Sequence, residues 1–444
     1  MPQKENTLSP AKTALATTSL AKELYQKTWP MLFGVFTLMS FHLADSAFIG
    51  QLGVAPLATV GFTLPIYQVI IGVQVGLGIA TTAIISRAIG AKQHNQANRT
   101  GGLIVLCGAI IIMALCSFTW WFRHGILALL GAEEGLVPLI DEYWPVWLIS
   151  AWCGAMLYFG YSICRAHGNT LLPGTMMTAT GLLNIALDPL FIFVFDLGIS
   201  GAAWATLTCF CLGGVIVYPK IWRHQWLSFD FARLNLKNTL LELSHVMGPA
   251  MLSQLMPSVS AIVATGIVAT WGTTAVAAWG LGIRLEYFSI VVVLAMTMSI
   301  PPILGKLFGA GDSRQIEQVL KISIRFILVW QLAIYLIWLA ISPALTGILT
   351  TETAVAEDLQ YYIATVPLSY GALGVCMLLV SACNAIGMPF WGLCISFTRL
   401  FACYLPFLWV GSQINDFYGL ITGAMVGNFV AGWMAWNIYS RQSR

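Results

Sequence analysis

Long apolar runs, separated by short polar or glycine- and proline-rich segments, follow one another along the chain from about residue 27 to residue 439. Each run has about the 20 residues that a helix needs to cross a lipid bilayer. The pattern predicts twelve membrane-spanning helices. They cover residues 27–50, 57–84, 100–122, 142–163, 172–195, 201–221, 244–269, 274–300, 319–342, 356–381, 389–411 and 417–439.

Composition supports the same class of protein. Of 444 residues, 58% are hydrophobic and only 9% are charged, which excludes an ordinary soluble protein. We therefore predict an all-α integral membrane protein embedded in the lipid bilayer. The net charge of +3 is too small to indicate nucleic-acid binding. The ten cysteines lie in or beside apolar runs without metal-ligand spacing, so we interpret them as small apolar residues and predict no metal and no cofactor.

The basic residues predict the orientation, because short loops rich in Lys and Arg stay in the cytoplasm. Residues 1–23 are polar and lack the apolar core of a signal peptide, so we expect a loose cytoplasmic tail. With this tail inside, every one of the 21 bases except Arg123, Arg284 and Arg399 falls in an inner segment. Both termini, including the short tail 441–444, are therefore predicted to be cytoplasmic.

The two halves of the chain repeat each other at an offset of about 219 residues. Gly90 and Ala91 recur as Gly309 and Ala310. Further pairs at this offset are Gly53 and Gly272, Gly61 and Gly280, Arg87 and Lys306, Tyr143 and Tyr362, Ser162 and Ser381, and Gly168 and Gly387. Six spans per copy give the copies the same orientation, so they are parallel repeats. We predict an N-lobe at 24–222, a cytoplasmic linker at 223–240 and a C-lobe at 241–440, which face one another around a central cavity and transport by alternating access.

Three acidic residues fall within the predicted spans: Asp45, Asp188 and Glu286. An ionisable side chain is costly there and indicates a functional site. Asp45 lies 15 residues beyond Pro30, and Asp188 lies 16 residues beyond Leu172, so helical rise places both at one depth. Asn184 shares the face of Asp188, and Thr206 and Tyr143 can add hydrogen bonds. Desolvation and a second carboxylate favour the protonated form, which is the chemistry of a proton-coupled site. A purely structural hydrogen-bond network is the alternative.

The remaining candidates have more ordinary interpretations. Glu286 and Arg399 fall at similar depth on spans eight and eleven, so we expect a structural ion pair. Aromatic, sulfur-containing and amide side chains on spans one, two and four can line an apolar substrate pocket, although helix packing also explains them. These substrate-binding candidates are Phe36, Met39, Gln68, Met156, Tyr158 and Tyr161.

Several motifs together resemble those of the multidrug and toxic compound extrusion (MATE) family, in its DinF-like branch. They are Pro30, the segment 45–50 (DSAFIG), the segment 87–91 (RAIGA), the segment 184–189 (NIALDP) and the segment 198–206 (GISGAAWAT). The resemblance implies an antiporter of the bacterial inner membrane whose twelve helices form two lobes around a V-shaped central cavity. We also expect a monomer, and an enzyme is disfavoured because no histidine or nucleophile cluster accompanies the buried acids. It would export drug-like cations and amphipathic compounds, antibiotics included, in exchange for protons or sodium ions. It also implies that Asp45, Asn184, Asp188, Thr206 and Tyr143 form the coupling site, and that the first helix bends near Pro30.

Two alternatives follow from the charged residues. Spans seven and ten hold only Glu357 and Asp358, at an outer end, which favours an N-lobe proton site over a C-lobe cation site. The oxygen atoms near Asp45 and Asp188 can also hold Na⁺. The second alternative is a flippase for a lipid-linked precursor, whose pyrophosphate requires an unpaired base at depth. Only Arg284 and Arg399 are candidates, so a cationic cargo is favoured.

Overall fold

The structure is a computed structural model that describes residues 10–131 and 134–442, and within these ranges every regular element is a helix. The first half contains α1 (Pro10–Gln51), α2 (Val54–Gly90), α3 (His94–Trp121), α4 (Arg123–Leu129), α5 (Val137–Ala166), α6 (Leu171–Pro189) and α7 (Gly198–Arg223). The second half contains α8 (Leu236–Ala269), α9 (Thr273–Ser289), α10 (Val291–Ser299), α11 (Pro301–Gly309), α12 (Ser313–Leu349), α13 (Thr353–Thr365), α14 (Tyr370–Ala385), α15 (Pro389–Phe397) and α16 (Leu405–Gln442). Two short 3₁₀ helices, η1 (Glu134–Leu136) and η3 (Val366–Ser369), and two π-helices, η2 (Leu190–Val194) and η4 (Thr398–Tyr404), complete the chain.

Eleven helical segments of the described residues are long and apolar enough to cross a membrane. One of them, Pro389–Gln442, contains two crossings, because its backbone leaves the helical region at Asn415 and Asp416, where the φ of Asp416 is 51°. This break falls between the last two predicted spans. The segment α9 to α11 forms the eighth crossing, which Ile290 and Ile300 interrupt. The prediction of twelve membrane-spanning helices in two lobes is confirmed.

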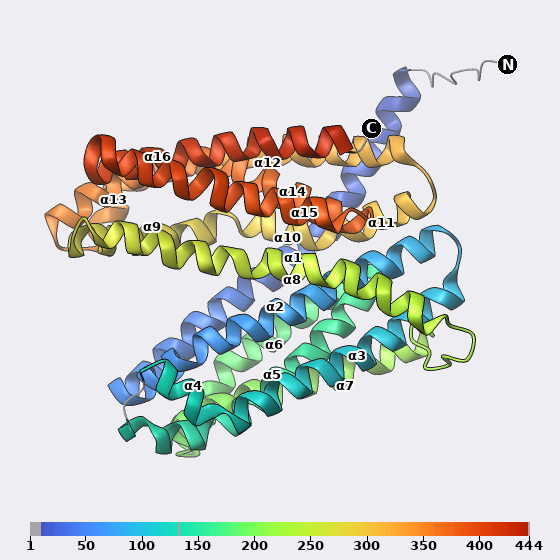
Figure 1. Cartoon of the computed structure of the whole chain (residues 1–444), viewed down its shortest axis with the longest axis horizontal. Coiled ribbons are helices and arrows are strands. Elements are labelled where there is room, and N and C mark those ends of the chain that lie inside the picture. The colour runs from blue at the N-terminus through green and yellow to red at the C-terminus, as the bar shows by residue number, and fades with distance from the viewer. Residues whose placement is uncertain (1–9, 132–133, 443–444) are drawn as a thin grey trace.

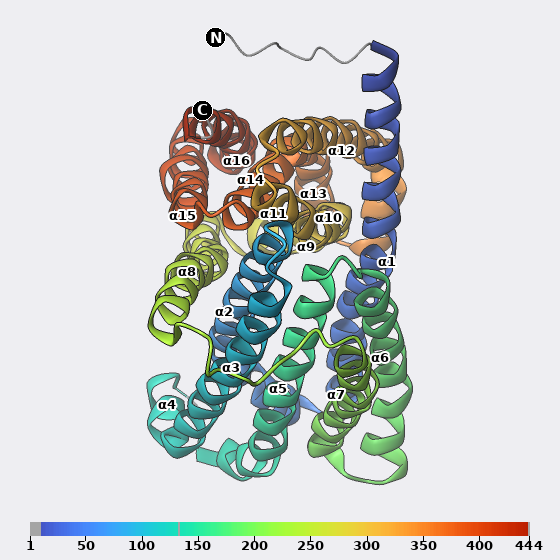
Figure 2. The same cartoon turned by 90° about the vertical axis from the view of Figure 1, so that its right-hand side faces the viewer.

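The two lobes converge at one end and diverge at the other, as Figure 1 shows for α1–α7 against α8–α16. The first helix belongs to both. Its later part packs along α6, whereas Leu24 near its start joins the hydrophobic core of the second half. Figure 2 shows α1 passing from the side of α12 to the side of α6.

The converging end is held by two reciprocal glycine contacts between α2 and α11. A Cβ atom placed on Gly90 would lie 2.1 Å from the carbonyl oxygen of Lys306, and one placed on Gly309 would lie 2.0 Å from the carbonyl oxygen of Arg87. Only residues without a Cβ let two backbones approach this closely. The four residues are the repeat pairs found in the sequence, so the contact has the twofold symmetry of the two lobes. We call it the glycine seal.

The N-terminal segment and the linker between the lobes were both predicted to lie outside the membrane, and the structure shows a helix in the first. Helix α1 begins at Pro10, so residues 10–23 are helical where a loose tail is expected; residues 1–9 lie outside the described part. Alanine, leucine and lysine in this stretch favour a helix, and an ion pair between Glu23 and Lys27 at 2.6 Å supports its last turns. The chain between α7 and α8 is irregular and is tied to α3 by an ion pair of 2.8 Å between Arg99 and Asp230.

Candidate functional site

Close packing of α1 against α6 sets the position of the two acidic residues of the N-lobe. A Cβ on Gly174 would lie 2.4 Å from the carbonyl oxygen of Pro30, and a Cβ on Gly181 would lie 2.7 Å from Cγ2 of Thr37. Both pairs have a sequence offset of 144, and the next pair two turns further along is Asp45 with Asp188, at an offset of 143. The two helices therefore run side by side in one register, which brings the two carboxyl groups together.

These carboxyl groups lie in a buried polar cluster with few hydrogen-bond donors. Asp188 is fully buried, Asp45 is partly buried, and the two interact electrostatically. Three carboxylate oxygens have no hydrogen-bond partner among the described residues: both oxygens of Asp188 and the Oδ1 atom of Asp45. Asn184 donates through Nδ2 to Oγ1 of Thr206 at 3.1 Å, and its own Oδ1 is unpaired. The cluster thus presents four unpaired acceptor atoms, which is the arrangement that a proton or a small cation would complete.

Two tyrosines complete this N-lobe cluster. Tyr143 is buried and lies within electrostatic range of both Asp45 and Asp188. Tyr67 on α2 lies within electrostatic range of Asp45, and it is not among the coupling residues predicted from the sequence. The five predicted coupling residues are therefore in one place, with Tyr67 as an addition. Helix α1 continues through Pro30, whose ring removes one backbone hydrogen bond from that turn.

The C-lobe carries a related cluster at equivalent positions. Glu286 occupies the position of Tyr67, and Tyr362 occupies the position of Tyr143, both at the offset of 219. Tyr362 and Tyr370 are buried around Glu286 and interact with it electrostatically. Glu286 and Arg399 also interact electrostatically, but they are not among the ion pairs within 4 Å that the described residues form. The expected ion pair is therefore not formed within 4 Å, and the two side chains interact only over a longer distance.

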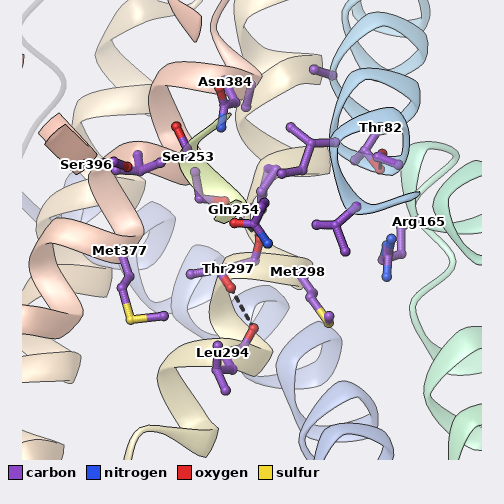
Figure 3. A pocket seen from close by; sticks show the side chains of 18 of the residues that line it. Thr82, Arg165, Ser253, Gln254, Leu294, Thr297, Met298, Met377, Asn384 and Ser396 are labelled. Atoms are coloured by element: carbon purple, nitrogen blue, oxygen red, sulfur yellow. Dashed lines mark hydrogen bonds between the residues drawn. The ribbon is translucent and has the colours of Figure 1, made fainter. Parts of the chain in front are cut away.

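A separate cavity of about 230 Å³ lies between the lobes, closer to the glycine seal, and Figure 3 shows its side chains. Its lining follows the internal repeat. Val75, Gly78, Ile79 and Thr82 on α2 correspond to Leu294, Thr297, Met298 and Pro301, and Tyr158 and Arg165 on α5 correspond to Met377 and Asn384 on α14. All these residues line the cavity, which therefore lies on the pseudo-twofold axis. Ser253, Gln254 and Pro257 of α8, with Ser396 and Arg399, add a side that the repeat does not duplicate.

The charge of this central cavity is opposite to that of the N-lobe cluster. Its described lining contains Arg165 and Arg399 and neither Asp nor Glu. The sequence predicts a cytoplasmic Arg165, because the apolar run of that span ends at about residue 163. Helix α5 continues to Ala166 and turns Arg165 inward, with 3% of the residue exposed. The available signal was the repeat itself, since Arg165 and Asn384 are polar at equivalent positions within otherwise apolar helices.

The predicted substrate-binding residues are distributed over several environments. Tyr158 lines the central cavity. Phe36 lies between the lobes, with its ring centroid 6.4 Å from that of Phe288, and Gln68 is exposed. The other three lie elsewhere in the N-lobe: Met39 packs against its core, Met156 lines a second pocket with Tyr218, and Tyr161 is buried in the core. The structure therefore brings one of the six into the cavity.

Comparisons with known proteins agree with this architecture. The MatE family model matches residues 30–190 and residues 249–410, once in each half of the chain. A "FAD transporter" of Shewanella oneidensis is 32% identical over 426 residues, which cover 94% of each chain. The "Multidrug export protein MepA" of Staphylococcus aureus is 24% identical over 409 residues, covering 91% of this chain and 90% of that protein.

A solved structure supports the assignment over the whole fold. The bent form of the Vibrio cholerae MATE transporter VcmN superposes with a TM-score of 0.95 at 53% identity, covering 97% of this chain and 98% of that one. The match of the family model to both halves and the identity to these relatives confirm the resemblance seen in the sequence. This chain belongs to the MatE family of membrane transporters.

Proposed function

We propose that this chain is a secondary active exporter of amphipathic organic compounds, in which Asp45 and Asp188 couple export to the inward movement of protons. The observation that carries the proposal is the pair of adjacent carboxyl groups with unpaired oxygen atoms. An ionised carboxylate without hydrogen-bond donors is costly to bury, so Asp188 requires a proton or a cation in this conformation. Opening the cluster to water removes that requirement and releases the ion.

The glycine seal suggests which conformation this is. The lobes are in contact at the end where α2 and α11 finish, and the charge distribution of the sequence predicts that this end faces the cytoplasm. The structure is then the outward-open state, in which a proton from outside can reach the cluster. Proton binding shifts the equilibrium only if it binds one state more tightly than the other. The register of α1 against α6, which determines the distance between the two acids, is the element most suited to differ between the states.

Sodium is the alternative coupling ion, because carboxylate, amide and hydroxyl oxygens also suit a hard cation. The two ions are distinguished by reconstituting the purified protein in vesicles and measuring release of a fluorescent cation. An imposed pH gradient without sodium should drive transport, whereas a sodium gradient at equal pH should not. Transport driven by sodium alone would assign the cluster to Na⁺ instead.

The proposed cargo includes drug-like cations and other amphipathic compounds. The proposed transporter is a monomer in the bacterial inner membrane. The acidic N-lobe cluster favours cations, and MepA is named a multidrug exporter. The name of the Shewanella relative indicates a flavin nucleotide, which is anionic.

The two arginines of the central cavity favour the flippase alternative. Arg165 and Arg399 meet the requirement for a base at depth, which the sequence left to Arg284 and Arg399. A flippase would move a fluorescent prenyl pyrophosphate lipid between leaflets of reconstituted vesicles. An exporter of water-soluble compounds would leave the distribution of this lipid unchanged while releasing the fluorescent cation.

A further inference from the structure

We infer that the central cavity contains an anion subsite, formed by Arg165 with Arg399, that binds the phosphate group of aromatic cargo. This inference deepens the proposed function, on which it rests for the role of the ligand as cargo. The binding event itself involves residues that are separate from Asp45 and Asp188.

Arg165 is the main component of the subsite. Only 3% of the residue is exposed, and a charged side chain this deeply buried is normally paired with an acid. Arg165 has no acid within 4 Å among the described residues. Its Nη2 donates to Oγ of Ser162 at 2.8 Å, and its Nη1 has no partner. Arg165 lines the cavity, and its guanidinium retains a buried donor without a partner, which a phosphate or carboxylate oxygen would satisfy once a small rotation of the side chain exposes it.

Arg399 provides a second positive charge on the opposite lobe. It lies on the π-helix η4, a widened turn of a kind often found at functional sites. Its carboxylate neighbour Glu286 lies beyond 4 Å and partly offsets its charge, so we assign Arg399 the weaker contribution. Neutral polar side chains complete the lining on the same side, namely Gln254, Ser396 and Asn384. Figure 3 shows Arg165 facing these residues across the cavity.

The rest of the lining favours an aromatic molecule next to the anion. Tyr158 places its ring 5.1 Å from the guanidinium carbon of Arg165, within the range of a cation–π interaction. Met298 and Met377 lie on the facing walls, and thioethers make favourable contacts with aromatic rings. A flat ring system between these side chains would leave its charged group at Arg165. The binding site therefore fits an aromatic phosphate better than a cation.

The test uses flavin mononucleotide and riboflavin, which share one ring system and differ by a phosphate. Their binding to the purified full-length protein in lipid nanodiscs is measured by flavin fluorescence at equal pH on both sides, so no gradient is involved. We expect flavin mononucleotide to bind the native protein at least about tenfold more tightly, since a desolvated charge pair contributes this much. R165Q should remove most of this preference, R399Q should reduce it less, and R165K should retain it.

Two controls separate loss of the site from loss of the fold. Riboflavin affinity should stay within about twofold in every variant that folds, because the ring contacts remain. R284Q removes an exposed arginine that does not line the cavity and should change neither affinity. In D45N and D188N the ratio of flavin mononucleotide affinity to riboflavin affinity should match that of the native protein even where transport fails, because a shift between conformations changes both affinities alike. Failure of the coupling proposal and failure of the subsite are therefore distinguishable.

The inference is overturned if the native protein binds the two flavins equally, or if R165Q and R399Q both keep the phosphate preference. Geranyl phosphate serves as a further probe, because it presents the same anion on an aliphatic chain. Binding of geranyl phosphate more tightly than flavin mononucleotide would overturn the aromatic assignment and indicate a prenyl phosphate cargo.

Discussion

The glycine seal should determine how readily the two lobes stay closed at one end. Replacing Gly90 with alanine adds a single methyl group at a point where an ideal Cβ lies 2.1 Å from the carbonyl oxygen of Lys306. Because that oxygen belongs to the backbone, no side-chain rotation relieves the clash. The lobes must separate locally by about 1 Å to restore an ordinary contact. G309A makes the symmetric change against the carbonyl oxygen of Arg87.

The expected energy follows from the geometry. Inserting a methyl group into a packed interface costs about 1–3 kcal/mol. Alanine is a better helix former than glycine by about 1 kcal/mol, so the helices themselves do not lose stability, and the penalty falls on the closed state alone. Each 1.4 kcal/mol changes a population ratio by about tenfold. G90A should therefore reduce the ratio of closed to open seal by about fivefold to 140-fold.

Distances between spin labels report this equilibrium. Asn95 and Arg314 are exposed near the seal on opposite lobes, and all ten cysteines are free, so they can be replaced before labels are introduced at these two positions. Pulsed electron resonance on the native seal should give a short distance, and G90A or G309A should shift the population towards a longer one. G214A is the matched control, because a Cβ on Gly214 meets nothing within 4 Å. Distance distributions that match the native one in both seal variants would refute the reasoning.

Two further predictions concern the N-lobe and the sealed end. G181V should push α1 away from α6 at Thr37 and reduce pH-driven transport in vesicles by about tenfold or more, since small displacements of a site are costly. The control G214V should transport at the native rate. Equal transport rates for G181V and G214V would contradict the proposed register. His167, just beyond α5, is half-buried, and burial lowers its pKa to about 4. The unfolded chain then binds the extra proton between about pH 6.5 and pH 4, so this histidine should cost stability as the pH falls through that window. On acidification from pH 7 to pH 4.5, the melting temperature of H167Q should therefore fall by about 1–2 °C less than that of the native protein. An equal fall in both proteins would contradict this role of His167.

The arrangement of helices and the acidic pair could be predicted from the sequence because they depend on local signals. Apolar length predicts a crossing, and residue counts along a helix give depth, which placed Asp45 and Asp188 at one level. Depth alone does not predict that the two acids are neighbours. That depends on the glycines of α6, which let this helix pack closely against α1.

The central cavity could not be predicted in the same way. The orientation rule assigns a basic residue at the inner end of a span to the cytoplasm. The side chain of Arg165 instead turns back along its own helix into the space between the lobes. Tyr67 was missed for a related reason. Its neighbour Asp45 lies on another helix, and a spacing rule applies only within one helix.

The central claim is that the acids of the N-lobe cluster carry the coupling ion. Its most direct test is pH-gradient-driven release of a fluorescent cation from vesicles that contain D45N or D188N, with insertion and folding verified by elution profile and melting temperature. Both variants should fold, because asparagine is close in size to aspartate and avoids a buried charge, and both should lose gradient-driven transport. Release at the native rate in both variants would contradict the account.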